Sequence, residues 1–202
     1  LESSGGFKDI ENISKSISDH NDVVAVAPFL SSQVVINNRD VSKGVFIKGT
    51  SAQEEISIIP DNMLIGEVES LEDGSNIILG DSLAYELNVA VGDSVNLLNI
   101  DQSNPLIGVP RVVAFKVVGV FSVGSEVDQN YALISSNSFL KLIKPKNGTG
   151  LELKVQNVLE ARNIGRAIIE KLDTTNYIKM TSWDQSYGGL FSCLLYTSDA
   201  AD

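Results

Sequence analysis

The segment Gly80-Asp81-Ser82-Leu83 is the first place in the sequence where residue types and spacing could support covalent chemistry. A serine in this motif serves one class of serine hydrolase as the nucleophile. It needs a histidine late in the chain, with an aspartate three residues before that histidine. The sole histidine, His20, lies upstream of Ser82, and the residue three positions before it is Ile17. A strand followed by a helix N-cap explains the same four residues. We therefore keep this hydrolase only as a distant alternative.

Nucleotide and metal sites also lack the residues they need. The glycines at 66, 74, 80 and 92 do not have the spacing of a phosphate-binding loop or a dinucleotide fingerprint. One cysteine and one histidine argue against a thiolate or histidine metal site. The acidic residues between Glu67 and Asp73 are explained more simply as a solvated loop than as a cation site. We expect no catalytic residue, no metal and no cofactor.

Charge and composition narrow the function classes further. The chain has 202 residues, of which 15 are Lys or Arg and 26 are Asp or Glu, so its net charge is -11. This acidity excludes nucleic acid as the expected partner, because phosphate binding needs a basic face. With 43% hydrophobic and 20% charged residues, the chain has a globular composition. No apolar run approaches the roughly 18 residues that a membrane-spanning helix requires. The chain does not begin with Met, so we expect a piece of a longer protein.

The hydrophobic pattern predicts a mixed α and β chain. Phe7, Ile10, Ile13 and Ile17 fall on one face of a first helix. A buried strand at 23–27 follows, and then a hairpin of strands near 32–36 and 45–47, joined by turn residues. Further strands are expected at 77–79, 91–100, 112–121, 131–134, 151–155 and 177–181, and further helices after Asp81, at 138–143 and after Asn157.

The order of these elements predicts the fold class. Asn157 with Glu160 forms the sequence pattern of a capping box, and Ala161, Ile164, Ile168 and Leu172 share a helical face. Strands 151–155 and 177–181 with this helix make a βαβ unit. Residues 7–27 form a matching αβ half, whose first strand we expect upstream of Leu1. We therefore predict an α+β fold: a ferredoxin-like βαβ layer interrupted by an inserted β-rich subdomain.

The loop 101–111 is the most informative segment for function. It links two strong strands, so it should be the long loop of a hairpin. Its tip carries apolar residues where ordinary turn residues would suffice, and two prolines that lower the entropy lost on binding. Such a tip can place anchors in a partner's hydrophobic pocket, or it can fold back on its own domain. The candidate partner-binding residues are Pro105, Leu106, Ile107, Gly108, Val109, Pro110 and Arg111.

Two groups of residues carry a resemblance to a known family. The first runs from Ile77-Ile78-Leu79-Gly80 through Leu83-Ala84 and Leu87 to Val91-Gly92-Asp93 and Val95. The second runs from Pro105, Gly108 and Pro110-Arg111 through Phe115 and Val118-Gly119 to Phe121 and Glu126-Val127-Asp128. In this order and spacing they resemble the LolC/LolE permease subunits of the bacterial lipoprotein-releasing ABC transporter, in the MacB/FtsX-like superfamily. The chain is more similar to LolC, or to a fused version of the LolC/LolE pair.

The resemblance implies a domain on the periplasmic face of the bacterial inner membrane. It implies porter-like halves at residues 1–49 and 126–186, and between them a sabre-like insertion at 50–125. The loop 102–111 would be the hook that binds the periplasmic carrier LolA. Leu106-Ile107 gives this tip one residue more than the LolC pattern. The other implied partners are a second permease subunit, a cytoplasmic ATPase subunit that hydrolyses ATP, and the lipoprotein substrate.

The end of the chain departs from this family. Residues 187–192 would begin the juxtamembrane segment, whereas residues 193–202 resemble a translated sequencing adapter, and we expect a non-native tail there. Another MacB/FtsX-like permease, serving efflux or the regulation of a cell-wall hydrolase, is the alternative function. Such a relative should lack the proline-braced apolar tip.

Overall fold

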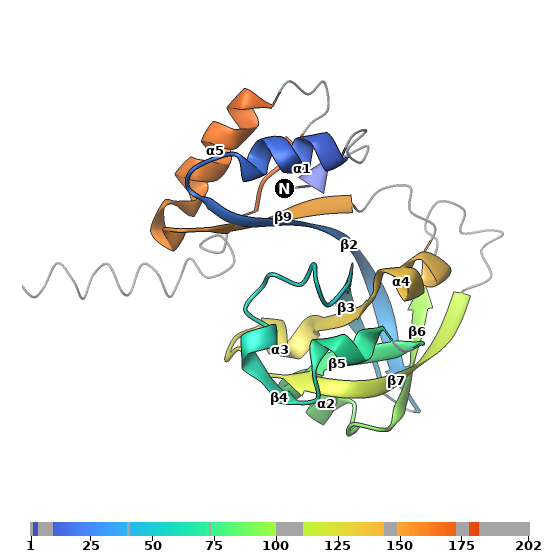
Figure 1. Cartoon of the computed structure of the whole chain (residues 1–202). Helices are drawn as coiled ribbons and strands as arrows, with labels where there is room; N and C mark the ends of the chain where they lie inside the picture. The colour runs from blue at the N-terminus through green and yellow to red at the C-terminus, as the bar shows by residue number, and fades with distance from the viewer. Residues whose placement is uncertain are drawn as a thin grey trace, which may run out of the picture.

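A computed structural model describes residues 2–3, 10–39, 41–72, 74–99, 111–143, 149–172 and 178–181 of the chain (Figure 1). The strands are β1 (Glu2–Ser3), β2 (Val23–Asn38), β3 (Val41–Thr50), β4 (Met63–Ile65), β5 (Asn76–Gly80), β6 (Ser94–Asn99), β7 (Arg111–Phe121), β8 (Tyr131–Ser135), β9 (Thr149–Val155) and β10 (Ile178–Lys179). The α-helices are α1 (Ile10–Ser18), α2 (Asp81–Glu86), α3 (Val127–Asn130), α4 (Ser136–Leu142) and α5 (Ala161–Lys171), and short 3-10 helices cover Pro60–Asn62, Val68–Leu71 and Val158–Glu160.

Four strands form a ferredoxin-like layer at one end of the molecule. They pair in the order β10-β1-β9-β2, and each neighbouring pair is antiparallel. In the chain order β1-α1-β2 and β9-α5-β10, this is the 4-1-3-2 arrangement of two interleaved βαβ halves, which confirms the predicted α+β fold. One expectation is corrected: Glu2–Ser3 occupies the position of the first strand, which the sequence pattern predicts upstream of Leu1.

The two helices of this layer cover the same face of the sheet (Figure 1). Their apolar residues meet the sheet in one cluster, in which Ile17, Leu151, Ile164 and Ile168 are buried. The predicted helical faces of α1 and α5 are therefore the faces that pack. Since burial of such side chains contributes about 1.5–3 kcal/mol each, this cluster is what stabilises the layer.

Strand β2 is longer than the sequence indicated. The two strands expected at 23–27 and 32–36 are a single strand of 16 residues. Its first part pairs with β9 from Val23 to Leu30, and its second part pairs with β3 from Leu30 to Asn38. Pro28 lies where β9 is the paired strand and the β3 ladder has not begun, so the N–H group that proline lacks is not needed for a second ladder.

The second part of the molecule is a closed barrel of six strands. The pairs run β2-β3, β3-β8, β8-β5, β5-β7, β7-β6 and β6-β2, so that each of the six strands has two neighbours. The β3-β8 and β5-β7 pairs are parallel and the others are antiparallel. Strand β7 also pairs with β4 through Val120 and Phe121, and its pairing with β5, β6 and β4 confirms that residues 112–121 form a central strand.

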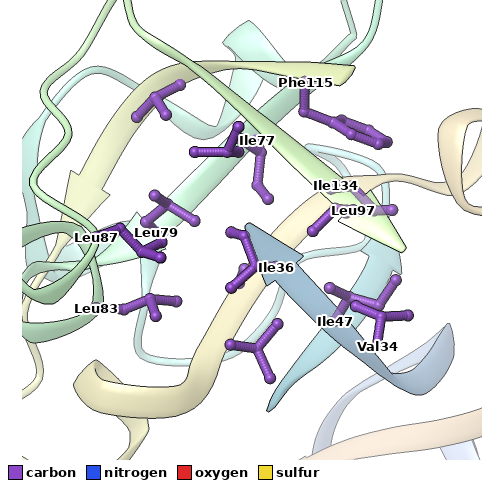
Figure 2. Close-up of a cluster of buried hydrophobic side chains, with 14 of the residues drawn as sticks. Val34, Ile36, Ile47, Ile77, Leu79, Leu83, Leu87, Leu97, Phe115 and Ile134 are labelled. Carbon is purple, nitrogen blue, oxygen red and sulfur yellow. The ribbon is translucent and has the colours of Figure 1, made fainter. Parts of the chain in front are cut away.

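The barrel interior is filled by side chains that alternate along each strand (Figure 2). Each of the six strands contributes at least two buried residues to this cluster, among them Val34, Ile36, Val45, Ile47, Ile77, Leu79, Val95, Leu97, Phe115, Val117, Ala132 and Ile134. Leu83 and Leu87 of α2, with Phe139 and Leu142 of α4, extend the same cluster. Period-two alternation places one face of every strand inside, so the barrel is a packed core.

The barrel is larger than the insertion expected at residues 50–125. It takes in the second part of β2, all of β3, and also β8 and α4, because these elements pair with or pack on the other barrel elements. The expected boundaries at 49/50 and 125/126 therefore fall inside the barrel. Local patterns showed these strands, whereas the pairing that assigns them to the barrel is non-local.

Two predicted helix starts differ in detail. Helix α2 begins at Asp81 with Gly80 as its N-cap, rather than with Asp81 in that position. At the helix expected after Asn157, the Asn157 side chain accepts a hydrogen bond from the Leu159 backbone N–H and caps the 3-10 helix that leads into α5. The Glu160 carboxylate accepts from the Asn163 side chain, so only one half of the predicted capping box is formed.

A buried ionic cluster joins the two parts of the molecule. The Lys48 Nζ of β3 lies 3.0 Å from Glu55 Oε1 and 2.5 Å from Glu152 Oε2 of β9. Lys48 and Glu55 are buried, and Glu152 is partly buried. The ammonium group also lies 5.7 Å from the centre of the Phe29 ring. Because β3 belongs to the barrel and β9 to the ferredoxin-like layer, these contacts link the two.

Candidate partner-binding site

The strands on either side of the loop 101–110 form the predicted hairpin. Strands β6 and β7 are antiparallel, with a register that runs from Ser94 opposite Lys116 to Asn99 opposite Arg111. The pairing therefore continues to the last described residue on each side of the loop. Of the candidate residues, Arg111 lies at the base of the hairpin and is exposed. Pro105, Leu106, Ile107, Gly108, Val109 and Pro110 lie outside the described residues.

Helix α4 holds the base of this hairpin. The Arg111 guanidinium donates a hydrogen bond of 2.6 Å to the carbonyl oxygen of Lys141, and the Asn99 side-chain amide donates one of 3.4 Å to the carbonyl of Leu142. The last carbonyls of a helix have no partner within the helix, so they are free to accept these bonds. Both strands of the hairpin are thus fastened to the end of one helix.

The position of α4 is itself fixed at its other end. The Ser135 hydroxyl accepts a hydrogen bond from the Ser138 backbone N–H, which caps the helix, and the Ser138 hydroxyl donates to the carbonyl of Gly74. Phe139 packs directly over Gly49 of β3, where a Cβ atom would lie 2.7 Å from the Phe139 Cβ. The hairpin base therefore rests on a helix that has little room to shift.

Exposed apolar side chains surround this base. Val112 of β7 and Leu140 of α4 are both exposed. On the outer face of the barrel, the register aligns Val112 with Leu98 of β6 and Leu98 with Val35 of β2. Val112, Leu98 and Val35 therefore lie side by side on the outer face of the barrel, next to the described base of the hairpin.

Of the described residues at the hairpin base, Arg111 was a candidate from sequence, whereas Asn99, Val112 and Leu140 were not. A usable signal existed for Leu140. Phe139, Leu142 and Ile143 have the three- and four-residue spacing of a buried helical face, and Leu140 lies off that face. For Asn99 there was no signal, because its partner is a helix carbonyl more than 40 residues away.

The structure separates the residues of the alternative hydrolase site. Ser82 is exposed on the first turn of α2, and its backbone N–H and hydroxyl both donate to the Asp81 carboxylate. His20 lies in the turn before β2, where its Nδ1 accepts from the Asp22 backbone N–H. Helix α2 packs on the barrel, whereas this turn lies at the far end of the ferredoxin-like layer (Figure 1). Ser82 and His20 cannot act together, so this alternative is withdrawn.

Curated relatives of this chain share one description, that of a lipoprotein-releasing system transmembrane protein. The chain is 28% identical over 177 residues to the lipoprotein-releasing system transmembrane protein LolC of Xylella fastidiosa, which covers 85% of this chain and 42% of that protein. It is 26% identical over 188 residues to LolE of Haemophilus influenzae, which covers 90% of this chain and 44% of that protein. It is 30% identical over 167 residues to LolC of Neisseria meningitidis, at 80% and 40% coverage. The chain thus spans less than half the length of these relatives.

Solved structures include a similar periplasmic region, that of MacB from Actinobacillus actinomycetemcomitans, with a TM-score of 0.49 and 14% identity over 84% of this chain and 79% of that one. Among the described residues, no helix is both long enough and apolar enough to cross a membrane. Residues 3–185 match the family described as the MacB-like periplasmic core domain. This match spans most of the chain, and the chain therefore belongs to that family.

Proposed function

We propose that this chain is the periplasmic domain of a permease in a lipoprotein-releasing ABC transporter, and that it acts by binding proteins. The observation that supports it most strongly is the similarity to LolC and LolE over 80–90% of the chain. In this proposal a second permease subunit and a cytoplasmic ATPase complete the transporter. The domain passes the released lipoprotein to a periplasmic carrier of the LolA type.

The loop 102–111 is the proposed hook that binds the carrier. Its described base supports this role, because Arg111 and Asn99 are both fastened to the end of α4. A fixed base holds the two arms of the hairpin in one orientation, which reduces the entropy lost when the tip binds. Val112 and Leu140 add exposed apolar surface beside it. The apolar tip residues, Leu106 and Ile107 above all, would enter a pocket of the carrier.

The test is a pull-down of the purified carrier LolA by the chain, with wild type compared with Ile107→Asp. We expect the substitution to weaken binding at least roughly tenfold, because a carboxylate in an apolar pocket loses its hydration without gaining a partner. The proposal places Ile107 on an exposed tip, and an exposed substitution away from the core changes stability by less than about 0.5 kcal/mol. The melting temperature should therefore stay within about two degrees of wild type.

The matched control is Tyr85→Asp, which places the same charge on another exposed apolar residue. Tyr85 is 89% exposed on α2, so this variant should bind the carrier as wild type does. Equal weakening by both variants would indicate a general charge effect and no hook. A wild-type domain that folds but does not bind LolA would favour the other reading of the MacB-like family match, a permease for a different substrate.

A further inference from the structure

Three exposed apolar side chains lie at the end of the ferredoxin-like layer that is opposite to the barrel. Val24 is 58% exposed, Val158 is 53% exposed and Leu159 is 67% exposed. Val24 is the bulged residue at the start of β2, and the other two lie in the short 3-10 helix between β9 and α5. The bulge at the start of β2 and the neighbouring 3-10 helix thus present apolar side chains at positions where polar residues would serve. We name Val24, Val158 and Leu159 the apolar turns.

Backbone and side-chain hydrogen bonds hold this region together. The Gln156 backbone N–H donates to the carbonyl of Asp22 at 3.0 Å, and its side-chain amide donates to the carbonyl of Asn21 at 3.0 Å. The Asn157 side chain accepts from the Leu159 N–H at 3.1 Å. The apolar side chains are therefore presented by a rigid base, and little order has to be gained when they are covered.

The register of the sheet shows which end of the layer this is. Glu2 of β1 lies opposite Gly150 of β9 and Lys179 of β10, and both pairs are antiparallel. Because both pairs are antiparallel, the direction from Glu2 toward the N-terminus of β1 is the direction toward Val155 along β9. It is also the direction toward the C-terminal end of β10. Val155 in turn lies opposite Val23, beside the apolar turns. The N-terminal end of β1 and the C-terminal end of β10 therefore both point toward the end of the layer that carries these turns, from the level of Gly150 near the start of β9.

We propose that the apolar turns rest on the lipid surface of the membrane in which the permease is embedded. The inference depends on the proposed function only for the presence of that membrane. The relatives are transmembrane proteins more than twice the length of the matched region, so segments outside the chain would enter and leave at this end. The same end would then face the bilayer, and the barrel with its hairpin would point away from it.

The local charges decide what kind of contact this is. The acidic residues Asp19, Asp22 and Glu160 lie on or next to these turns, together with the basic residues Lys154 and Arg162. This mixture has no excess of positive charge, so attraction to anionic lipid does not drive the contact. Burial of apolar side chains at the level of the headgroups does. The contact should therefore form on zwitterionic lipid and persist when salt is raised.

The experiment places a fluorophore in the turns of the chain tethered to vesicles. Leu159→Cys, in a Cys193→Ser background, is labelled with an environment-sensitive dye. A histidine tag at the N-terminus attaches the protein to phosphatidylcholine vesicles that contain a nickel-chelating lipid and a spin-labelled quencher lipid. We expect a shift of the emission to shorter wavelength and at least roughly twofold quenching, both unchanged when salt is raised to about 0.5 M, where exposed charges are screened.

Two controls separate lipid contact from the effect of the tether. Tyr85→Cys, labelled in the same way on the barrel, should show neither shift nor quenching. Val24→Asp with Val158→Asp, added to the Leu159→Cys protein, should return its quenching to the Tyr85 level. Quenching that survives these two substitutions would show that the tether alone brings the site close, and would overturn the proposal.

A label at residue 159 that stays unquenched on a tethered, folded domain would overturn it as well. So would a shifted emission without lipid quenching, which would indicate a protein partner on the turns. No carrier is present in this experiment. A domain that binds LolA but shows no quenching would therefore refute only the membrane contact, and quenching without LolA binding would refute only the carrier-binding hook.

Discussion

Lys48 is the residue on which the junction between the barrel and the ferredoxin-like layer depends. Its ammonium group is buried between two carboxylates, Glu55 from the segment after β3 and Glu152 from β9. The Ser57 backbone N–H also donates to Glu55 Oε1. A buried carboxylate is costly unless it has a cation and hydrogen-bond donors. Lys48 supplies the cation for both carboxylates, Glu55 after β3 of the barrel and Glu152 of the ferredoxin-like layer.

Replacement of Lys48 by Met should destabilise the protein strongly. The substitution keeps most of the aliphatic volume but leaves Glu55 and Glu152 without their cation, and loss of one partner of a buried ion pair costs about 3–5 kcal/mol. Urea unfolding followed by circular dichroism measures the effect. Lys43→Met is the matched control, because Lys43 pairs with Glu86 at the surface, where a pair contributes about 0–1 kcal/mol. Equal effects of the two variants would contradict this role.

At the scale of elements, helix α4 connects the barrel to the candidate binding loop. Its N-terminus is capped by Ser135, its middle is packed over Gly49, and its last carbonyls accept bonds from the hairpin base. A substitution that displaces α4 should therefore displace the hairpin base as well, even if the substituted residue does not contact the hairpin.

Gly49→Ala tests this connection. The new Cβ would lie 2.7 Å from the Cβ of Phe139, so the helix must shift, and overpacking of this kind costs about 1–3 kcal/mol. We expect a lower melting temperature and weaker binding of LolA. Gly44→Ala on the same strand is the control, since its new Cβ would meet only the Gln33 side chain at 3.9 Å. Unchanged stability and binding in Gly49→Ala would show that α4 does not position the loop.

The elements themselves were largely predictable from sequence, because helix and strand periods are local. The faces of α1 and α5 and the β2-β3 hairpin were found in this way. The continuity of β2 through Pro28 was not, since it depends on which side of the strand has a partner. At the candidate binding site, the prolines and apolar residues marked the loop 101–111, whereas the hydrogen bond that fastens the hairpin base to α4 joins residues 30 positions apart.

At the scale of the whole molecule, ring closure was the feature that the sequence could not show. The barrel is completed where β6 pairs with β2, through Leu98 opposite Val35. Nothing in the alternation of either strand specifies that partner. The same alternation would suit an open sheet, and closure depends on how the interior side chains of all six strands pack together.

The barrel and the layer should unfold in one cooperative transition. They share β2, and the Lys48 cluster crosses between them, so neither can open without exposing apolar strand surface of the other. Calorimetry should show a single peak, and hydrogen exchange should be similarly slow in both parts of β2. Two peaks, or fast exchange confined to residues 23–29, would mean that the layer unfolds by itself.

The sixteen residues of β2 also have a mechanical consequence. At about 3.3 Å per residue the strand is roughly 50 Å long, with the β9 ladder along its first part and the β3 ladder along its second part. A force that pulls the barrel away from the layer loads both ladders along the strand direction, so that many hydrogen bonds must yield together rather than one after another. A displacement of the layer would therefore be transmitted through β2 to the barrel, because the paired strand resists stretching.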